Sequence, residues 1–428
     1  MSFHALGLDP RLLQNVLGQG YRVSTPIQKK AIPAILAGRD VVGLAQTGTG
    51  KTAAFVLPLL QRLMSGPRHR LRALIVGPTR ELAEQTKDVL AKLGEHTGFR
   101  SVAIYGGVGQ RPQIDAVRQG AEIAIACPGR LLDLLGQGQF NLAHVECLVL
   151  DEADRMFDMG FLPDIRKILQ RLPAQRQILL FSATMPDEIR ALVHDILRDP
   201  VTIQIARSKP AETVDHALYP VEQTQKAALL LALLGQIGAG SVLVFTRTKH
   251  RAKRLAAQLS AAGHRAASLQ GNLSQRQRQA ALDGFKSGQH QILVATDLAA
   301  RGIDVDDITH VINFDMPATV DDYTHRIGRT GRAAKTGDAF TFTTREDEGA
   351  VRAIERVLGF QIARRRLEGF DYSSAPPPVP GHGQPRHPPA GSRPAGAPRG
   401  KPGGPGRRPS PGGVRSFGSP KAKRRFSR

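Results

Sequence analysis

Residues 45 to 52 read AQTGTGKT, a run of small residues that ends in a lysine and a threonine. The spacing matches the phosphate-binding loop GxxxxGK followed by Ser or Thr, except that Ala45 stands where the first glycine is expected. Gly48 and Gly50 can let backbone N–H groups approach phosphate oxygens, and Lys51 can neutralise their charge. The threonine that follows can ligate magnesium. An ordinary tight turn between a strand and a helix would use the same small residues.

A pair of carboxylates, Asp151 and Glu152, directly follows the apolar run CLVL (147 to 150). In open α/β sheets, ligands bind outside the carboxyl ends of the strands. Asp151 could hold magnesium, directly or through water, and Glu152 could polarise the water that attacks a γ-phosphate. A solvated acidic loop explains the two residues equally well in isolation. Together with the Lys51 loop, they indicate a site that hydrolyses a nucleoside triphosphate.

Short apolar runs alternate with helix-like segments along the chain, which is the βαβ rhythm of a parallel sheet covered on both faces. The first half contains DVVGLA (40 to 45), ALIVGPT (73 to 79), EIAIACP (122 to 128), CLVLDEAD (147 to 154) and QILLFSAT (177 to 184). The second half contains SVLVFTRT (241 to 248), AASLQG (266 to 271), QILVATD (291 to 297), HVINFDMP (310 to 317) and AFTFTT (339 to 344). The predicted fold class is α/β, with two similar parallel-sheet lobes.

Changes in composition divide the chain into two lobes, a linker and a tail. The segment ARSKPAETVD (206 to 215) is polar and aperiodic, as expected of a plain tether or of a linker that permits lobe motion. From about residue 371 the chain is rich in Pro, Gly, Ser and Arg, with 12 basic residues and no acidic residue after Asp371, which predicts a disordered basic tail. The predicted domains are 1–205, 216–370 and the tail 371–428, with the linker at 206–215.

Bulk composition limits the class of protein. The 428 residues carry 59 Lys and Arg against 37 Asp and Glu, and the net charge of +22 favours either nucleic acid or an acidic membrane surface as partner. Only Cys127 and Cys147 occur, without CxxC spacing, so neither a disulfide framework nor a zinc site is indicated. A reducing compartment fits best, and the N-terminus lacks the pattern of a secretory signal.

Residues 227 to 246 contain no charged side chain over a length that could span a bilayer. Gly235, Gly238 and Gly240 interrupt this stretch. A short buried helix, a glycine turn and a buried strand explain the pattern better than a membrane span. We therefore expect a cytoplasmic protein without a membrane segment.

The loop AQTGTGKT, together with Asp151-Glu152-Ala153-Asp154, resembles the DEAD-box ATP-dependent RNA helicases, whose phosphate loop begins with alanine. The resemblance extends through almost all of residues 3 to 345, and it implies two tandem RecA-like lobes that bind ATP and Mg²⁺. The compact build and the basic tail resemble the bacterial RhlE-like branch. The segment KAKRRFSR (421 to 428) also resembles a nuclear-import patch.

The stretch GYRVSTPIQ (20 to 28) resembles the Q motif of this family, in which Gln28 would read the adenine edge and Phe3 would pack near the base. The plain alternative for Gln28 is an exposed amide before a helix over 29 to 36. Ser24 replaces a proline that is usual in the family. The resemblance assigns ATP binding to Phe3, Tyr21, Gln28, Ala45, Gln46, Thr47, Gly48, Thr49, Gly50, Lys51, Thr52 and Asp304, and Mg²⁺ to Thr52 and Asp151.

The second lobe contains YTHRIGRTGR (323 to 332), which in the family faces the nucleotide of the first lobe. Arg329 and Arg332 would act there as arginine fingers. The segment TRTKHR (246 to 251) is expected to stand where the first lobe has its phosphate loop, so the second lobe should not bind ATP independently. The implied catalytic residues are Lys51, Asp151, Glu152, Arg329 and Arg332, and the implied interlobe coupling residues are Ser182, Thr184, Asp154, His325 and Arg326.

A second set of segments resembles the RNA-contacting motifs of the family: PTRELA (78 to 83), YGG (105 to 107), PGR (128 to 130), QGNLSQRQR (270 to 278) and ATDLAARGIDV (295 to 305). Their N–H groups, hydroxyls and arginines suit phosphate and ribose contacts, although any one could be an ordinary turn. Cys127 and Gln270 replace a threonine and a histidine that are usual in the family. The implied RNA-binding residues are Arg80, Gly107, Gly129, Arg130, Gln275, Arg278 and Thr296.

The predicted function is an ATP-dependent RNA helicase that locally unwinds short duplexes and remodels RNA or RNA–protein complexes by closing and opening its lobes. Ribosomal RNA and RNA-decay assemblies are candidate partners. Two alternatives remain: a DNA-directed helicase of the same superfamily, and an ATP-gated RNA clamp or annealing chaperone. The tail could tether RNA, anneal strands or only solubilise the protein. The sequence leaves the natural RNA, the protein partners and the oligomeric state open.

Overall fold

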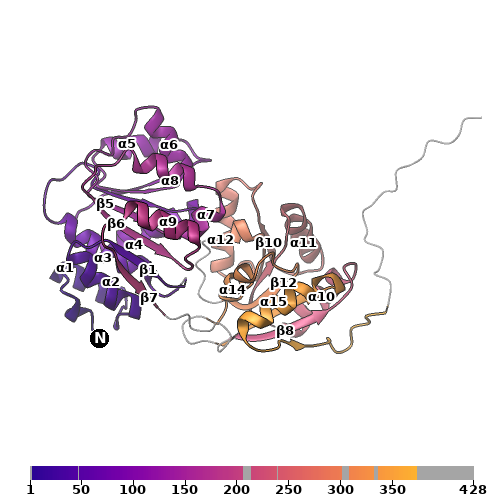
Figure 1. The fold of residues 1–428 in the computed structure, drawn as a ribbon. Coiled ribbons are helices and arrows are strands. Elements are labelled where there is room, and N and C mark those ends of the chain that lie inside the picture. Colours follow the sequence, from indigo (N-terminus) through magenta and orange to yellow (C-terminus); the bar gives the residue numbers. More distant parts are fainter. Residues whose placement is uncertain are drawn as a thin grey trace, which may run out of the picture. The chain divides into compact units, whose positions relative to one another are not determined.

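The computed structural model describes residues 2–46, 48–205, 214–238, 240–300, 308–331 and 336–373, and it contains two seven-stranded parallel sheets (Figure 1). The predicted α/β fold with two RecA-like lobes is confirmed. Three predicted site residues, Thr47, Asp304 and Arg332, lie outside the described residues. Residues 206–213 of the predicted linker and the tail from residue 374 also lie outside them.

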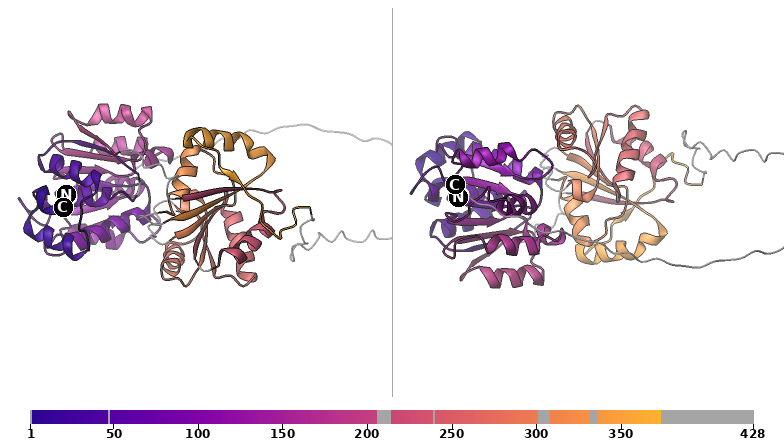
Figure 2. Two further views of the ribbon diagram at one scale, coloured as in Figure 1. Left: turned by 90° about the horizontal axis from the view of Figure 1, so that it is seen from below. Right: turned by 90° about the horizontal axis from the view of Figure 1, so that it is seen from above.

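The first sheet has the strand order β3-β4-β2-β5-β6-β1-β7. Its central strands are apolar and buried because helices cover both faces, as a parallel sheet requires (Figure 2). The strands are β1 Val41–Leu44, β2 Ala73–Val76, β3 Ser101–Ile104, β4 Ile123–Ala126, β5 Cys147–Leu150, β6 Gln177–Ser182 and β7 Val201–Gln204. The helices are η1 Phe3–Leu6, α1 Pro10–Gly18, α2 Pro26–Leu36, α3 Lys51–Leu63, α4 Arg80–Leu93, α5 Arg111–Arg118, α6 Pro128–Gly136, α7 Ala153–Asp158, α8 Leu162–Leu169 and α9 Asp187–Ile196.

The second sheet has the strand order β10-β11-β9-β12-β13-β8-β14. Strand β8 begins at Val214, so its first two residues fall within the range predicted as linker, 206–215. The strands are β8 Val214–Pro220, β9 Ser241–Phe245, β10 Ala266–Leu269, β11 Ile292–Ala295, β12 Ile308–Asn313, β13 Gly337–Thr343 and β14 Ala363–Arg364. The helices are α10 Lys226–Ile237, α11 Lys249–Ala261, α12 Gln275–Lys286, α13 Asp297–Ala300, α14 Val320–Ile327, η3 Arg345–Asp347 and α15 Glu348–Leu358.

The two sheets have the same strand order, because β8 to β14 take the places of β1 to β7 one for one. This order corrects one prediction. TRTKHR (246–251) follows β9, which is the counterpart of β2, so the segment corresponds to PTRELA (78–83) and not to the phosphate loop. The counterpart of the phosphate loop is the segment 221–225, between β8 and α10.

Each sheet separates two layers of core. In the first lobe, helices α1 to α4 pack on one face through residues such as Leu12 and Phe55, and helices α5 to α9 pack on the other through residues such as Leu131 and Met156. In the second lobe, α10 and α11 cover one face, and α12 to α15 cover the other. The cores hold the strands in place, so their carboxyl ends form fixed edges on which loops can present functional groups.

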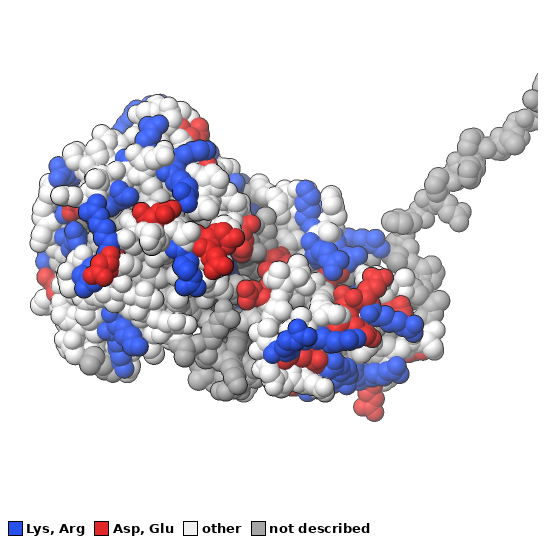
Figure 3. Space-filling model, in the orientation of Figure 1, with Lys and Arg blue, Asp and Glu red and all other residues white. Residues whose placement is uncertain are grey.

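The uncharged stretch 227–246 divides as predicted, since α10 ends at Ile237 and β9 begins at Ser241. Within the described ranges, no helix is long and apolar enough to cross a membrane. On the face in Figure 3, Lys and Arg side chains are scattered among Asp and Glu side chains. The positive charge of the described part is therefore not gathered into one patch on this face.

Candidate functional site

The loop between β1 and α3 has the backbone that a phosphate-binding loop requires. Gly48 and Gly50 have φ values of 85° and 87°, in the left-handed region that strains any residue with a side chain. Ala45 does not have a positive φ, and its methyl group is buried in the core at 3% exposure. Alanine therefore fits at the position where the general pattern has its first glycine.

Lys51 is the first residue of α3 and is 7% exposed. Its Nζ donates a 2.7 Å hydrogen bond to the backbone oxygen of Ala45, at the end of β1. The loop therefore folds back on its own lysine, which holds the ammonium group at the carboxyl edge of the sheet. A cation in this place is suited to closely spaced phosphate oxygens.

Asp151 and Glu152 follow β5, the strand two places from β1, and are 3% and 6% exposed. Burial raises the pKa of Asp151 to about 7, although the charge of Lys51 opposes this shift. Glu152 has a left-handed backbone, with φ 52° and ψ 51°, and its Oε2 accepts a 2.9 Å hydrogen bond from Nη1 of Arg155. The alternative of a solvated acidic loop is wrong, because both carboxylates are buried.

Asp154 connects the end of β5 to the end of β6. Its Oδ2 accepts hydrogen bonds from the N–H of Ala183 at 3.0 Å and from the N–H and hydroxyl of Thr184 at 2.8 and 3.0 Å. Ser182 completes the link, since its Oγ accepts from the N–H of Asp154 at 3.2 Å. Burial alone would raise the pKa of Asp154, but the Lys51 charge and the Thr184 hydrogen bonds lower it below its usual value.

Gln28 lies inside α2 and is 1% exposed, so the alternative of an exposed amide is wrong. Its Oε1 accepts from the N–H of Thr25, the N-cap residue of α2, at 2.9 Å. Its Nε2 donates to the backbone oxygen of Gly50 at 3.1 Å, which brings the Q motif against the phosphate loop. Phe3 is 1% exposed and meets the 37% exposed ring of Tyr21 edge-on, with centroids 6.3 Å apart.

Three predicted RNA-contacting loops of the first lobe converge. A Cβ on Gly107 would collide with the guanidinium of Arg80, and one on Gly106 would lie 3.9 and 4.0 Å from the guanidinium nitrogens of Arg80 and Arg130. Arg130 also donates to the backbone oxygen of Val108 at 3.3 Å. The loops after β2, β3 and β4 therefore place two arginines against a glycine pair.

Gly129 and Cys127 lie at the start of α6, beside these loops. Cys127 is the N-cap residue, and its side chain makes no capping hydrogen bond. Burial raises the pKa of its thiol to about 12, so it remains neutral at physiological pH. Cys127 has no hydroxyl, so it cannot make the contact that a threonine would offer at this position.

In the second lobe, Arg326 is 3% exposed and uses its guanidinium within its own lobe. It donates to both carboxylate oxygens of Asp297, at 2.6 and 2.7 Å, and to Oδ1 of Asn313 and the backbone oxygen of Asp315, at 3.1 and 2.7 Å. His325 precedes it on α14, and Arg329 follows two residues after the end of that helix. The next residue, Thr330, donates to the backbone oxygen of Ile308 at 2.6 Å.

The remaining predicted RNA residues follow two neighbouring strands of the second sheet, β10 and β11. Gln275 begins α12, and Arg278 in its first turns donates to the backbone oxygen of Ala299 at 3.4 Å. Thr296 follows β11, and its backbone oxygen accepts from the N–H of Ala300 at 2.8 Å. The loops after β10 and β11 are therefore adjacent.

Sequence reasoning missed three partners of these residues. Arg155 pairs with Glu152, Asp297 pairs with Arg326, and Thr25 caps the helix that carries Gln28. The spacing of three residues between Glu152 and Arg155 indicates a possible pair, because Glu152 is the N-cap residue of α7 and Arg155 lies in its first turn. The pairing of Asp297 with Arg326 joins residues 29 apart, and no local pattern reveals it.

Comparison with known proteins assigns the family. The chain matches the family model described as DEAD/DEAH box helicase over residues 25–192 and the model described as helicase conserved C-terminal domain over residues 225–334. It is 44% identical to the DEAD-box ATP-dependent RNA helicase RhpA of Helicobacter pylori (strain B128), over 80% of this chain and 70% of that protein. It is 42% identical to the DEAD-box ATP-dependent RNA helicase CshA of Geobacillus kaustophilus, over 86% and 79%.

A solved structure supports the same conclusion. The S. cerevisiae protein Dbp5 bound to RNA and ADP BeF3 superposes with a TM-score of 0.78 at 30% identity, covering 85% of this chain and 95% of that one. Two family models, relatives above 40% identity and this solved structure thus agree with the buried lysine and carboxylates at the sheet edge. The chain belongs to the DEAD-box ATP-dependent RNA helicases.

Proposed function

We propose that this RNA helicase hydrolyses ATP at the carboxyl ends of β1, β5 and β6 and uses the cycle to open short RNA duplexes locally. The observation that carries the proposal is the buried group formed by Lys51, Asp151, Glu152 and Asp154. Four charged side chains are rarely buried together unless they serve a site, because burial of charge is costly.

Each of these residues has a proposed task. Lys51 neutralises the β- and γ-phosphates, and Glu152 orients and deprotonates the attacking water. The Arg155 guanidinium would aim the Glu152 carboxylate, given their 2.9 Å hydrogen bond. Gln28 would read adenine, with Tyr21 as the exposed ring beside it and Phe3 packed behind Tyr21. The remaining loop residues from Gln46 to Thr52, together with Asp304, would complete the ATP contacts.

The residues present fit Mg²⁺. Among the described residues no cluster of three His, Cys, Asp or Glu side chains could hold a metal ion. Mg²⁺ at nucleotide sites commonly uses one or two protein oxygens, with water and phosphate oxygens completing its shell. We propose the carboxylate of Asp151 and the hydroxyl of Thr52 as those oxygens. When bound, the ion would neutralise charge that develops on the phosphates.

The second lobe is proposed to supply Arg329 and Arg332 to the reaction. Arg326 would act as a positioning residue, because its bonds to Asp297, Asn313 and Asp315 fix α14 just before Arg329. His325 and the Asp154 to Thr184 link would couple the lobes. RNA would lie along Arg80, Gly107, Gly129 and Arg130 and, in the second lobe, along Gln275, Arg278 and Thr296.

Local strand opening is proposed because both sets of RNA loops present arginines and backbone groups, which hold a strand without reading bases. The bacterial placement is supported by the relatives named RhpA and CshA. The narrower RhlE-like assignment is supported only by the compact build and basic tail. Ribosomal RNA and RNA-decay assemblies are proposed partners, and the domain limits 1–205 and 216–370 with the tail from 371 are proposed as functional units.

Two measurements test the proposal. Steady-state ATPase assays with RNA and DNA strands of equal length should show stimulation by RNA only; equal stimulation would favour the DNA-directed alternative. Glu152→Gln should lower ATP turnover roughly 100- to 10,000-fold while ATP-dependent RNA binding persists. A matched exposed control, Glu188→Gln in α9, should behave as wild type.

Unwinding assays separate the remaining alternative. The wild type should open a short RNA duplex in each round of binding and should fail on a much longer one. If Glu152→Gln unwinds duplexes over many turnovers as fast as wild type does, the proposed catalytic role of Glu152 is wrong. If the wild type anneals strands but does not unwind duplexes, the alternative of an RNA clamp or annealing chaperone is favoured.

A further inference from the structure

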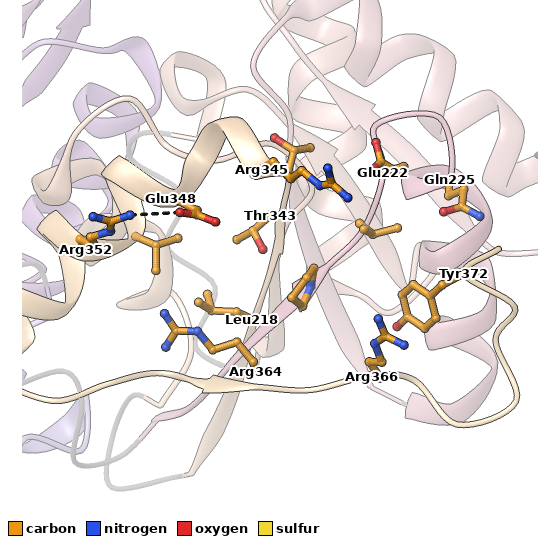
Figure 4. A pocket seen from close by; sticks show the side chains of 14 residues that line it. Leu218, Glu222, Gln225, Thr343, Arg345, Glu348, Arg352, Arg364, Arg366 and Tyr372 are labelled. Carbon is orange, nitrogen blue, oxygen red and sulfur yellow. Dashed lines mark hydrogen bonds and ion pairs between the residues drawn. The ribbon is translucent and has the colours of Figure 1, made fainter.

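A cavity of about 530 Å³ lies in the second lobe, where β8, β13 and β14 reach their carboxyl ends (Figure 4). Pro220 and Gln225 line it between β8 and α10, and Thr343 and Arg345 line it after β13. Its volume is within the range of small-molecule sites, about 300 to 1,000 Å³. None of the residues assigned to ATP or RNA above belongs to its lining.

This cavity is the topological counterpart of the ATP site. The identical strand orders make β8 the equivalent of β1, β13 the equivalent of β6, and α10 the equivalent of α3. Lys226 begins α10 as Lys51 begins α3, and it too is buried. Its Nζ donates to the backbone oxygen of Phe342 at 3.2 Å, as Nζ of Lys51 donates to Ala45.

The machinery for hydrolysis is missing from this counterpart. The segment 221–225 reads VEQTQ and contains no glycine, so its backbone cannot wrap a phosphate as the loop at Gly48 and Gly50 can. Asp315, close after β12, stands near the place that Asp151 occupies after β5. Its carboxylate already accepts from the N–H of Arg247 at 2.8 Å and pairs with Arg251. A ligand would therefore be held here without being hydrolysed.

In this cavity, arginine side chains take the place of a glycine-rich loop as the groups that can bind phosphate. Arg345 and Arg366 reach the cavity from opposite sides (Figure 4), and within the described ranges neither guanidinium has a carboxylate partner. Two further lining arginines are paired, Arg352 with Glu348 and Arg364 with Glu355. Glu222 also lines the cavity, so the lining carries four arginines against two carboxylates, Glu222 and Glu348.

An aromatic ring lies beside the arginines. The guanidinium carbon of Arg366 is 5.1 Å from the centroid of the Tyr372 ring, and both side chains line the cavity. Guanidinium groups bind phosphates in a forked geometry, while aromatic rings and guanidinium planes stack on nucleobases. The combination matches a ligand that carries both phosphates and a base, and it matches an acidic peptide less well because such a peptide has no base to stack.

We propose that this cavity is a second nucleotide site, which binds a nucleoside polyphosphate through Arg345 and Arg366 with the base beside Tyr372. The ligand is not hydrolysed there. The site would let the helicase respond to a nucleotide other than the one it consumes.

Equilibrium binding of a non-hydrolysable GTP analogue to the full-length protein tests the proposal, because an adenine-reading Gln28 site should discriminate against guanine. Arg345→Ala/Arg366→Ala should weaken binding by about tenfold or more for each guanidinium removed, and Lys51→Ala should leave it unchanged. Arg345→Lys/Arg366→Lys keeps the charge and loses the fork, so it should give an intermediate affinity. Tyr372→Leu should also weaken binding.

The matched control is Arg356→Ala/Lys286→Ala, which removes two exposed cations of the same lobe that do not line the cavity. It should bind the analogue as wild type does, and thermal melting should show that every variant is folded. The proposal is overturned if Lys51→Ala abolishes binding while the arginine pair does not matter. It is also overturned if the wild type does not bind the analogue and the arginine variants lose affinity only for single-stranded RNA or for a polyglutamate peptide.

Discussion

Neighbouring acids in the segment 151–154 have opposite protonation tendencies, although they are within four residues of one another. Burial raises the pKa of Asp151 to about 7, whereas the charge of Lys51 and the Thr184 hydrogen bonds lower the pKa of Asp154 despite its burial. Asp151 therefore changes charge near neutral pH, while Asp154 stays ionised and keeps its hydrogen bonds. The difference arises because Asp154 has donors around it and Asp151 has few.

The raised pKa of Asp151 predicts a pH dependence of stability. Because the folded chain holds this proton more tightly than the unfolded chain, stability falls as pH rises from about 4 to about 7 and is flat on either side. The loss is at most about 4 kcal/mol, at about 1.4 kcal/mol per pKa unit. Asp151→Asn should abolish this loss, so the variant should gain stability relative to wild type across that window.

Urea denaturation at a series of pH values measures this difference. The control Asp88→Asn changes an exposed carboxylate of α4. Its difference from wild type in the free energy of unfolding should stay constant over the same pH window. A constant difference between Asp151→Asn and wild type from pH 4 to 8 would contradict the prediction.

At the level of elements, the start of α3 and the first turn of α2 form one unit. Gly50 caps α3 with a left-handed backbone, and its carbonyl oxygen accepts from Gln28 of α2. The Q motif and the phosphate loop, 22 residues apart in sequence, are therefore held in register by one hydrogen bond and one glycine.

Gly50→Ala should damage this unit in two ways. The left-handed backbone costs about 1–2 kcal/mol for a residue with a side chain, and the new Cβ would lie 2.5 Å from Nε2 of Gln28. We expect a lower melting temperature and at least tenfold weaker ATP binding, measured by thermal melts and nucleotide titration. Gly138→Ala has a similar φ of 66° but an open surrounding, so it should lose stability without losing ATP affinity. Equal ATP affinity in the two variants would contradict the role of the contact.

Elements were predictable where several apolar residues occur in a row. All ten quoted runs contain strands. Nine of these strands lie inside a sheet, where a strand buried on both faces must be apolar throughout, and the tenth, β10, is an edge strand. Strands β3, β7, β8 and β14 were not predicted, and each of them is an edge strand or lies next to an edge. Edge strands are covered less completely, and β7 and β14 carry exposed residues that weaken the apolar signal. The loop at Ala45 and the acids at Asp151 were predictable from spacing, whereas the Asp297–Arg326 pairing depends on packing between distant segments.

At the scale of the whole molecule, two sheets of identical order carry different loops. The first sheet has a glycine loop and buried acids at its carboxyl edge, while the second has arginines there and engages its aspartate in bonds to Arg247 and Arg251. Strand order places TRTKHR after the counterpart of β2, whereas motif spacing alone does not show which strand a segment follows. We therefore propose that the same fold serves catalysis in one lobe and ligand binding in the other.

The tail adds charge to this framework. Its 12 basic residues are over half of the net charge of +22, and the residues from 374 onward lie outside the described part. Deleting 374–428 should weaken RNA binding at low salt and leave maximal ATP turnover nearly intact. The slope of log K for RNA binding against log[salt] should become less steep by about 0.7 for each lost phosphate contact. Filter binding at several salt concentrations measures both effects.

A chain in which these 12 residues are replaced by glutamine keeps the tail length and removes its charge. It should behave as the deletion does. Unchanged RNA affinity in both chains would support a tail that only solubilises the protein.

The proposed catalytic role of Glu152 has a cost for the fold at this position. Its left-handed backbone is one that glycine adopts freely and glutamate adopts at an expense of about 1 kcal/mol. A glycine would relieve this dihedral strain, but it would leave the buried guanidinium of Arg155 without the carboxylate to which it donates at 2.9 Å. Engineering for heat tolerance could not relieve this strain by replacing Glu152, because the replacement would remove the carboxylate that is proposed to activate water.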